Sequence, residues 1–375
     1  MASNKKTFDA AIVGAGIVGA ACAVALAREG LKVLILDSSS AASGTTAAGM
    51  GHIVAMDDSP AQLALTHYSQ KLWRRLAPEL PASCEYENCG TIWVAANADE
   101  MSEVHRKKAV YDENGITAHV LDAQALLDAE PNLAKHLSGG LLVDSDAVVY
   151  QLAATRYLLL KAVKQGAEYR QFNSVASLSD DGVGLPSGER ISAGTTINAA
   201  GAHAGDLSPS LEIRPRKGHL VITDRYPGFV RHQLVELGYL KSAHGSDASS
   251  VAFNVQPRKT GQILLGSSRQ FNSNDDAVDN AILNRMAARG FEYMPALKEM
   301  SAVRVWTGFR PATPDNLPYI GKVTGFKNIY AAAGHEGLGI TMSLGTAELL
   351  ADEIMGRESP IPRQPYSPGR SAASS

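Results

Sequence analysis

Cysteine is scarce in this 375-residue sequence, which contains three: Cys22, Cys84 and Cys89. No two of them form a C-x-x-C pair, and no histidine pair lies near Cys84 or Cys89, so the sequence predicts no metal site. So few cysteines are typical of a protein in a reducing compartment. We therefore expect a cytoplasmic protein, with peripheral association at the inner membrane as the alternative.

An excess of charge of one sign is also absent. The chain has 35 Lys and Arg residues against 38 Asp and Glu residues, a formal net charge of −3. This balance gives no reason to expect nucleic acid or an anionic membrane as a partner. The length and the hydrophobic content of 45% are sufficient for a large core and two structural lobes.

Residues 8–37 have the pattern of a strand, a glycine-rich turn, a helix and a second strand. Phe8–Val13 is a short apolar run typical of a buried parallel strand. Ile17–Glu29 is rich in Ala, Val and Leu, as expected of a helix packed on a sheet, and Gly30 is placed to end it in a left-handed turn. Val33–Leu36 is the second apolar strand.

The turn of this unit carries the G-x-G-x-x-G spacing. Gly14 permits the tight turn, Gly16 lets the backbone approach a pyrophosphate, and Gly19 lets the helix pack closely on the strand. Free N–H groups at the start of the helix can hold phosphates. Asp37 follows Gly19 by eighteen residues, a distance that suits a carboxylate accepting a ribose hydroxyl. This spacing between two strands predicts a bound dinucleotide.

A membrane or export segment is the alternative interpretation of this stretch. Residues 10–27 carry no charge over eighteen positions, and Lys5 and Lys6 precede them. The dinucleotide spacing of the glycines and the immediate second strand argue against this interpretation. We therefore predict that the N-terminal segment is part of a soluble fold.

Residues 38–58 form a segment rich in Ser, Gly and Ala, which predicts a loop. Hydroxyl groups and backbone donors in this loop could contact a ligand, and its glycines leave room for a ring system. These residues are Ser43, Gly44, Thr45, Thr46, Gly49 and Gly51. The alternative is a flexible linker, which would not need the apolar residues that follow at positions 53 and 54.

Helical and strand patterns alternate through the rest of the chain. We expect helices over residues 61–76, 99–114, 121–130, 150–165, 275–289 and 340–355. We expect strands over residues 89–95, 139–143, 146–149, 168–172, 195–200, 303–308 and 329–333, and a hairpin over residues 251–271. Residues 358–375 are rich in Pro and Ser, so we predict a disordered tail.

Several separated motifs agree with one family. They are VGAGIVG with Asp37, SGTTAAGMGHI, INAAGA, GFRPATPDNLPYIG and AAGHEGLGITMS. Over about residues 8–356 the chain resembles the D-amino-acid oxidase (DAO) family of FAD-dependent oxidoreductases, most of all the glycine oxidases and the D-amino-acid and D-hydroxyproline dehydrogenases. The resemblance implies FAD as the cofactor, held non-covalently, because no cysteine lies in the motifs expected at the flavin.

The patterns and the resemblance together predict an α/β fold of two lobes. One is a Rossmann-like FAD-binding lobe with a parallel sheet, in three segments: residues 1–85, 141–215 and 305–357. The other is a substrate lobe with an antiparallel sheet and helices, in two segments: residues 86–140 and 216–304.

The resemblance also implies a set of FAD-binding residues. Those expected at the pyrophosphate and the ribose are Gly14, Gly16, Ile17, Val18, Gly19, Asp37 and Ser38. Those expected along the adenine and the flavin are Ser43, Gly44, Thr45, Thr46, Ala48, Gly49, Met50, Gly51, Val175, Ala200, Gly201, Gly308, Gly334, His335, Gly337, Leu338, Gly339, Ile340 and Thr341. Many relatives carry Glu where this chain has Asp37.

Arg310 matches the family arginine that clamps the substrate carboxylate. A guanidinium group can hold a carboxylate by two parallel bonds, which fixes its orientation as a lysine could not. The alternative is a structural arginine in an ion pair. The resemblance implies that the α-hydrogen leaves as a hydride to flavin N5, which needs no dedicated acid–base residue. His52, Asn254 and His335 are the further candidate residues of the catalytic pocket.

Two departures from the family narrow the substrate. Asn254 stands near where several oxidases place a pocket tyrosine, and Gly337 stands where glycine oxidase carries a second positively charged residue. Both leave a roomier pocket than glycine needs. The segments AAGMGHIVAMDD and GHEGLGITMS most resemble dehydrogenases of the D-proline or D-hydroxyproline type. This resemblance implies the dehydrogenation of a D-amino acid or cyclic imino acid, with a quinone or a partner subunit as electron acceptor.

Two other interpretations stay open. One is a glycine- or sarcosine-type oxidase that reduces O2 to H2O2. The other is a flavin-binding subunit that relays electrons in a larger complex, against which the intact motif around Arg310 argues. The sequence leaves both a homo-oligomer and a hetero-oligomer open.

Overall fold

The N-terminal βαβ unit builds the first of two large sheets in the computed structural model, which describes residues 7–238, 249–271, 273 and 275–370. The strand order of this sheet is β17–β18–β11–β1–β2–β8, with β10 and β9 attached to β11. The strands are β1 (Phe8–Val13), β2 (Val33–Leu36), β8 (Glu168–Arg170), β9 (Ser177–Ser179), β10 (Gly182–Gly184), β11 (Arg190–Asn198), β17 (Tyr319–Lys322) and β18 (Ile329–Ala333). Because β8, β2, β1, β11 and β18 are parallel, their carboxyl ends meet at one edge of the sheet.

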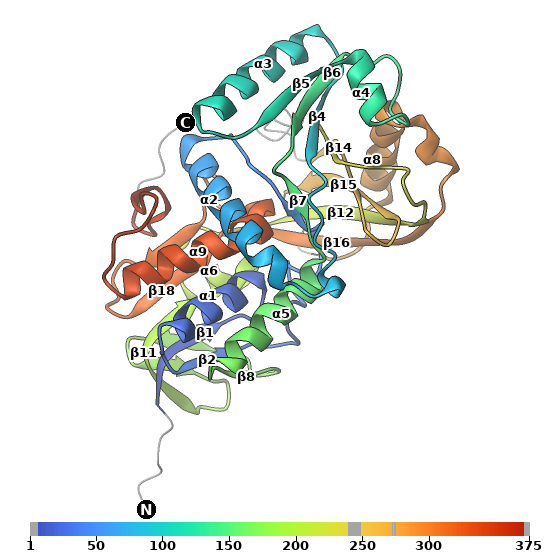
Figure 1. Ribbon diagram of the computed structural model, residues 1–375. Helices are drawn as coiled ribbons and strands as arrows, with labels where there is room; N and C mark the ends of the chain where they lie inside the picture. Colours follow the sequence, from blue (N-terminus) through green and yellow to red (C-terminus); the bar gives the residue numbers. More distant parts are fainter. Residues whose placement is uncertain (1–6, 239–248, 272, 274, 371–375) are drawn as a thin grey trace, which may run out of the picture.

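Four helices lie beside this sheet in Figure 1: α1 (Ile17–Arg28), α2 (Pro60–Leu76), α5 (Gln151–Lys164) and α9 (Gly339–Ile354). Helix α1 packs against both α5 and α9, so nine of its twelve residues are buried. Because α1 is covered by helices on two sides, residues 10–27 carry no charge although they do not span a membrane. In the part of the chain that the structure describes, no helix is both long enough and apolar enough to cross a membrane.

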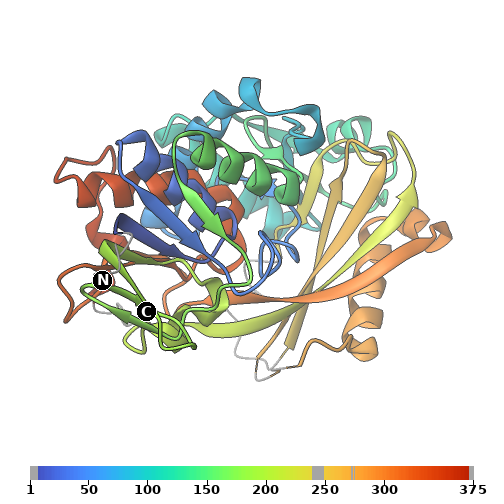
Figure 2. The same ribbon diagram turned by 90° about the horizontal axis from the view of Figure 1, so that it is seen from below.

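The second sheet is mostly antiparallel and has the order β16–β12–β15–β14–β13–β4–β6–β5. Its strands are β4 (Thr91–Ala95), β5 (Ala118–Asp122), β6 (Gly139–Val143), β12 (Arg214–Arg225), β13 (Gln233–Glu236), β14 (Ser249–Pro257), β15 (Gln262–Gln270) and β16 (Ala302–Ala312). Three helices pack on it: α3 (Ala98–Glu113), α4 (Ala123–Ala129) and α8 (Asn280–Tyr293). Figure 2 shows β12 and β16 as the long strands that extend from this sheet toward the first. The predicted fold class, an α/β fold with one parallel and one antiparallel sheet, is confirmed.

The remaining elements are short. A two-stranded sheet pairs β3 (His52–Ile53) with β7 (Ala147–Val148). The short helices are η1 (Ala77–Glu79), η2 (Ala82–Cys84), η3 (Gly201–His203), α6 (Ala204–Leu207), η4 (Pro295–Glu299), η5 (Glu336–Leu338) and η6 (Gln364–Tyr366). Strand β16 continues through residues 305–312, beyond the lobe boundary predicted at residue 304.

Two predicted helices begin later than expected. Residues 121 and 122 belong to the edge strand β5, which pairs with β6, so α4 begins at Ala123. Helix α8 begins at Asn280 rather than at residue 275, because the carboxylate of Asp279 caps it by accepting from the N–H groups of Ala281 and Ile282. Strand pairing and capping decide these boundaries, and residue propensity does not reveal them.

The prediction of a disordered tail is wrong for residues 358–370. Tyr366 in η6 is 1% exposed, and its hydroxyl donates to Ala61 O at 2.6 Å. Arg370 pairs with Asp315 at 2.7 and 2.8 Å and lies over the ring of Tyr319. One buried aromatic ring and one paired arginine hold a segment whose Pro and Ser content predicts disorder. Residues 371–375 lie outside the described part.

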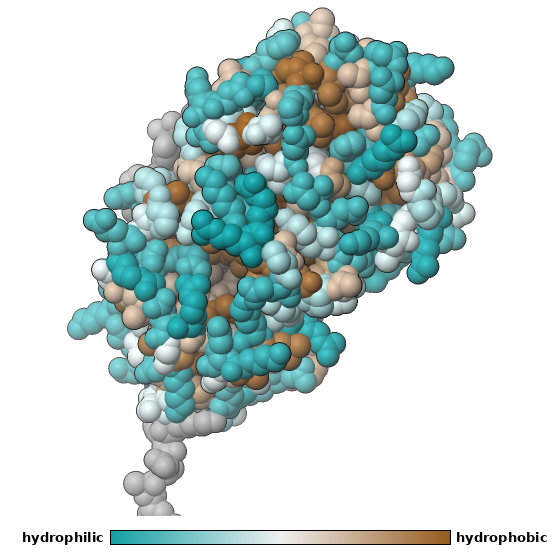
Figure 3. Space-filling view, viewed as in Figure 1, coloured by the Kyte–Doolittle hydropathy of each residue, from teal (hydrophilic) through white to brown (hydrophobic). Residues whose placement is uncertain are grey.

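The surface drawn in Figure 3 is mostly hydrophilic. Hydrophobic side chains gather near the top of that view, over the edge strand β5 between α3 and α4. Val120, a residue of β5, is 38% exposed.

Candidate active site

A cavity of about 960 Å³ opens at the carboxyl ends of the parallel strands. Val13, Leu36 and Ala333, the last residues of β1, β2 and β18, line it, and so do residues of β12 and β16 from the second sheet. Ligands of open α/β sheets bind at this edge of the sheet. The volume lies at the upper end of the range for ligand pockets, which suits a dinucleotide with a small substrate beside it.

The glycine-rich turn forms one end of the cavity. Gly14 has φ +110°, and a Cβ atom there would lie 2.4 Å from Ala199 O, so no other residue fits. Helix α1 begins at Ile17, and its N-cap residue, Gly16, provides no side-chain cap; its first turn has no acidic residue. Its N-terminal amide groups therefore suit a pyrophosphate, and the N–H of Ile17 donates to the hydroxyl of Thr46 at 3.1 Å.

Asp37 closes β2 at the same end of the cavity. Its carboxylate accepts from the N–H of Ala15 at 2.6 Å and from the N–H of Ser39 at 2.8 Å. These two bonds fix the carboxylate beside the glycine-rich turn, on the cavity wall. Its contact with a ribose hydroxyl stays a prediction.

The loop after β2 is tied to three neighbouring elements. Thr45 donates through Oγ1 to Phe309 O on β16 at 2.8 Å. The side-chain amide of Gln151 donates to Gly49 O at 2.6 Å, and the amide of Gln256 on β14 donates to Met50 O at 2.8 Å. A segment held in this way is a wall of the cavity and not a flexible linker.

The start of α9 forms another wall of the cavity. This segment lies near the end of the chain, far in sequence from the glycine-rich turn. His335, Gly337, Leu338, Gly339 and Ile340 all line the cavity, and α9 has no side-chain cap. A helix N-terminus carries about half a positive charge, which favours negative charge on a reduced flavin. The predicted placement of a flavin at this helix end therefore fits the electrostatics of the cavity.

Two histidines, the buried His335 and the half-buried His52, border this wall in their neutral form. Burial lowers the pKa of His335 to about 3, and its Nε2 lies 2.9 Å from the hydroxyl of Thr346. Burial also lowers the pKa of His52 to about 4, against the opposing effect of its contact with Gly337 O at 3.2 Å. Since Gly337 O is an acceptor, His52 Nε2 carries the proton. Neither histidine is charged at neutral pH.

Arg310 lies on β16 and reaches the cavity between two glycines. A Cβ atom at Gly218 would lie 2.5 Å from its Nη1, and one at Gly337 would lie 3.5 Å from its Nε. Nη1 donates to Ser268 O at 2.9 Å. Among the described residues, no carboxylate forms an ion pair with Arg310, which weakens the alternative of a structural ion pair. Asn254 also lines the cavity and is 8% exposed.

Four predicted FAD-binding residues do not line the cavity and pack behind its wall. They are Gly19, Gly51, Gly334 and Thr341. A Cβ atom at Gly19 would lie 2.0 Å from Gly14 O, as expected of a glycine that lets α1 pack on β1. Thr341 donates to His52 O at 3.0 Å. The other predicted residues line the cavity, and their individual roles stay predictions.

Sequence reasoning missed several charged and aromatic residues of the cavity. They are Asp58, Trp93, Arg216, Arg269, Asp276, Arg304, Trp306 and Glu336. Glu336 stands inside the GHEGLG motif, and this position was the one feature of the sequence that could have identified a missed residue. The others come from strands or loops whose pairing is not visible in the sequence.

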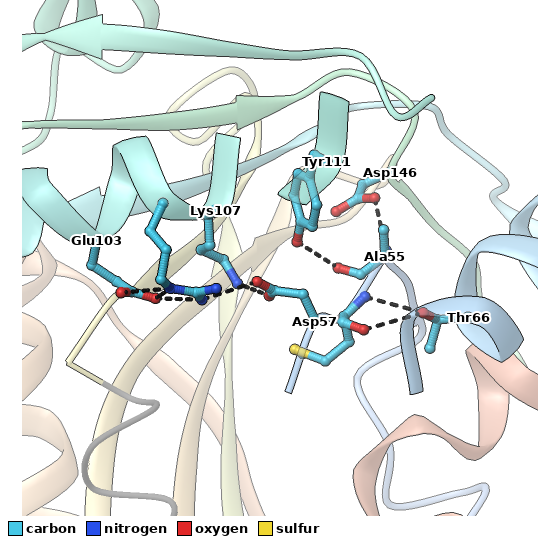
Figure 4. A network of polar contacts seen from close by, with 9 residues as sticks. Ala55, Asp57, Thr66, Glu103, Lys107, Tyr111 and Asp146 are labelled. Atoms are coloured by element: carbon cyan, nitrogen blue, oxygen red, sulfur yellow. Dashed lines mark hydrogen bonds and ion pairs between the residues drawn. The ribbon is translucent and has the colours of Figure 1, made fainter. Parts of the chain in front are cut away.

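A buried polar network holds the segment between β3 and α2, which contributes Val54, Met56 and Asp58 to the cavity wall. Figure 4 shows its contacts with α3 and the loop before β7. Tyr111 donates to Ala55 O at 3.0 Å, and the N–H of Ala55 donates to the buried carboxylate of Asp146 at 3.1 Å.

The charged part of this network is the ion pair between Asp57 and Lys107. Their side chains are 1% and 0% exposed. The exposed Arg106 also reaches Asp57, at 3.2 Å. The Lys107 ammonium lies 4.2 Å from the ring centre of Trp93, which itself lines the cavity. The ion pair therefore supports the cavity wall from behind.

The comparisons with known proteins agree with these observations. Residues 9–353 match the DAO family, FAD dependent oxidoreductase. The chain is 27% identical to a glycine oxidase of Pseudomonas aeruginosa, over 95% of this chain and 97% of the relative. It is 26% identical to a D-amino acid dehydrogenase of Methylobacterium nodulans, over 96% and 98%.

Solved structures have the same fold. The crystal structure of glycine oxidase from Geobacillus kaustophilus has a TM-score of 0.87 and 25% identity, covering 97% of this chain and 99% of that one. The structure of L-proline dehydrogenase from P. horikoshii has a TM-score of 0.88 at 22% identity, covering 97% of both chains, and shows the fold alone. The family predicted from the motifs is confirmed: the chain belongs to the DAO family of FAD-dependent oxidoreductases and is an amino-acid oxidase or dehydrogenase.

Proposed function

We propose that this protein catalyses the FAD-dependent dehydrogenation of a D-amino acid or cyclic imino acid, of the D-proline or D-hydroxyproline type. The observation that carries the proposal is the guanidinium group of Arg310 at the cavity wall. It lies beside Gly337, at the start of the turn that leads into α9, where the flavin is expected. A carboxylate bound there would have its α-carbon near the reactive face of the cofactor.

The protein's own part in the reaction is alignment. Arg310 would hold the substrate carboxylate by two parallel bonds, and its bond to Ser268 O fixes the guanidinium group in advance. Bound FAD would accept the hydride from the α-carbon and supply the difficult step. The substrate leaves as the imino acid. Because His52 and His335 are neutral, neither brings a competing positive charge near the carboxylate.

Room beside the clamp supports a substrate larger than glycine. Gly337 places no side chain in contact with the guanidinium group, and Asn254 contributes a short amide to the wall. A pyrrolidine ring or a branched α-carbon could occupy this space. D-proline and cis-4-hydroxy-D-proline are therefore the first substrates that we would test.

Two alternative functions are each supported by similarity to a known protein. An oxidase would return the electrons to O2, and similarity to curated glycine oxidases supports it. An assembly with partner subunits is supported by 27% identity to a protein named as the hydrogen cyanide synthase subunit HcnC of Pseudomonas protegens. Production of peroxide against reduction of an artificial dye separates oxidase from dehydrogenase.

The decisive experiment mixes the purified yellow protein anaerobically with single amino acids and follows the flavin absorbance. The panel is D-proline, cis-4-hydroxy-D-proline, D-alanine, glycine and sarcosine. We expect bleaching by a D-amino or cyclic imino acid. A yellow protein that no amino acid bleaches, alone or with the L-enantiomers, would contradict the proposal.

Arg310→Met tests the clamp directly. We expect a large rise in KM, since each lost charge-assisted hydrogen bond is worth roughly 1.5–3 kcal/mol. The control is Arg225→Met, at the exposed far end of the neighbouring strand β12 and outside the cavity. Unchanged turnover by the Arg310 variant would refute the assignment.

A further inference from the structure

A second, smaller cavity lies directly behind one wall of the large cavity. It has a volume of about 220 Å³. Its other walls come from the start of α5, from β12 and from the hairpin of β14 and β15. The residues that line both cavities are Ala47, Gly49, Met50, Arg304 and Trp306. We call these five residues the partition, because the two cavities lie on its two sides.

The loop of the partition is thin and held in place. Three of its backbone carbonyl groups accept hydrogen bonds from side chains that line the second cavity. The donors are Trp306, Gln151 and Gln256, which bond Ala48 O, Gly49 O and Met50 O at 3.4, 2.6 and 2.8 Å. Gly49 adds no side chain to the loop, and a Cβ atom there would lie 2.9 Å from Cδ1 of Ile340. The loop expected to line the flavin therefore lies between the start of α9 and the second cavity.

The second cavity has a mostly apolar lining. Its apolar residues outside the partition are Val148, Val149, Leu152, Ile222, Pro257 and Leu264. Lys259 and Arg304 line it as well and are exposed, so the cavity reaches the surface. Arg258 pairs with Glu85 at 2.6 Å and lies 4.4 Å from the ring centre of Tyr150. Walls held by such contacts are formed before a ligand arrives.

The size and the lining of the second cavity favour one class of ligand. Its volume is below the range of about 300–1,000 Å³ that is usual for ligand pockets, so it is too small for a dinucleotide. The apolar walls and the half-buried indole ring of Trp306 suit a flat ring system. No side chain of the described residues caps the start of α5, so N–H groups of its first turn can donate to a carbonyl oxygen. A quinone combines a flat apolar ring with carbonyl oxygens.

We propose that the second cavity binds a quinone, which receives the substrate's electrons across the partition. The substrate loses two electrons and two protons when it becomes the imino acid. The hydroquinone carries the same number of each away, so the cycle balances without O2. The amino acid and the quinone occupy different cavities and can be bound at the same time. This inference rests on the proposed function as a dehydrogenase and adds to it the site of the electron acceptor.

Two competing explanations predict different behaviour. In the first, the acceptor enters the substrate cavity after the imino acid has left, so a carboxylate bound at Arg310 would exclude it. In the second, the small cavity is only a gap in the packing, so a side chain that fills it would not affect the acceptor. Binding and reoxidation measurements separate both explanations from our proposal.

The first measurement is the binding of menadione, a naphthoquinone without a lipid tail, to the oxidised FAD-loaded protein by equilibrium dialysis. We expect one equivalent to bind, with an affinity that saturating pyrrole-2-carboxylate leaves unchanged. Ile222→Trp fills the second cavity from β12, outside the large cavity, and should weaken binding about tenfold or more. The control is Leu160→Trp, at a position on α5 that is 52% exposed and outside both cavities.

The second measurement follows reoxidation by menadione of protein reduced with dithionite, which makes it independent of the amino-acid substrate. Ile222→Trp should slow this reoxidation about tenfold or more and leave bleaching by the amino acid nearly unchanged. If Ile222→Trp does not fold, the competition with pyrrole-2-carboxylate in the unmodified protein still tests the inference.

The possible failures are distinguishable. Absence of menadione binding, its displacement by pyrrole-2-carboxylate, or equal reoxidation of Ile222→Trp and the unmodified protein would overturn the inference and leave the proposed function intact. Absence of bleaching by every amino acid tested would overturn the proposed function itself.

Discussion

The buried ion pair between Asp57 and Lys107 leads to an asymmetric prediction for stability. Both side chains are buried, but Asp57 has a second partner in the exposed Arg106, at 3.2 Å. Lys107 is otherwise surrounded by the rings of Trp93 and Tyr111, at 4.2 and 5.5 Å. Removal of the acid therefore leaves a buried ammonium group without a carboxylate, whereas removal of the lysine leaves Asp57 with Arg106.

The expected magnitudes follow from this difference. Asp57→Asn should lower the free energy of unfolding by about 3–5 kcal/mol, as in other proteins where one partner of a buried pair is removed. Lys107→Met should cost roughly 2 kcal/mol, because the aliphatic packing is kept and one charge-assisted bond is lost. The double variant contains no buried charge at this position, so it should be more stable than Asp57→Asn alone.

Urea unfolding followed by circular dichroism measures these differences, with Lys108→Met as the control. Lys108 lies next in sequence, but it forms a surface pair with Asp112, so its replacement should cost about 0–1 kcal/mol. If Asp57→Asn proves no more destabilising than Lys107→Met, or if the two single effects simply add in the double variant, the argument from an uncompensated buried charge is refuted.

Three further predictions concern the cofactor site and pH. Gly14→Ala should abolish FAD retention, measured as flavin absorbance per chain, because the added Cβ atom would overlap Ala199 O. The control is Gly30→Ala, which should retain FAD, because Gly30 also has a positive φ but a Cβ atom there would meet nothing within 4 Å. Burial raises the pKa of Asp146 to about 7. The folded state then holds a proton that the unfolded state releases above about pH 4, so stability should fall from pH 4 to 7, and Asp146→Asn should flatten this slope. Burial lowers the pKa of His335, so its effect on the pH dependence of stability is opposite to that of Asp146. Stability should fall as pH drops from about 6.5 toward 3, and His335→Gln should flatten that slope in urea unfolding.

The parts of the fold that were predicted well are those specified locally. The bounds of β1 and β18 match the prediction, because a short apolar run between glycine or polar residues allows few other structures. The hairpin of β14 and β15 was also predicted, since its turn at Gly261 needs a positive φ. By contrast, the expected helix start at residue 121 is wrong, because pairing of β5 with β6 overrides the helical preference of those residues.

The candidate site divides in the same way. The dinucleotide turn and the motif around Arg310 are each formed by one continuous stretch of sequence. The predicted residues in both stretches line the cavity, apart from those that pack behind it. Glu336 adopts a positive φ of 49°, which a sequence does not reveal for a glutamate. Arg269 reaches the cavity only because β15 pairs with β12, a contact between segments about fifty residues apart.

Arg216 shows most clearly why the charged wall could not be predicted. The sequence there reads Arg214, Pro215, Arg216, Lys217, and composition cannot say which of the three cations faces a ligand. The register with β16 places Arg216 opposite Arg310, on the cavity side. Alternation along the strand then turns Lys217 away, and its buried ammonium pairs with Asp275 at 2.9 Å. A slip of one residue would exchange these two roles, so the choice of the residue that faces the cavity depends on strand register and not on the number of basic residues.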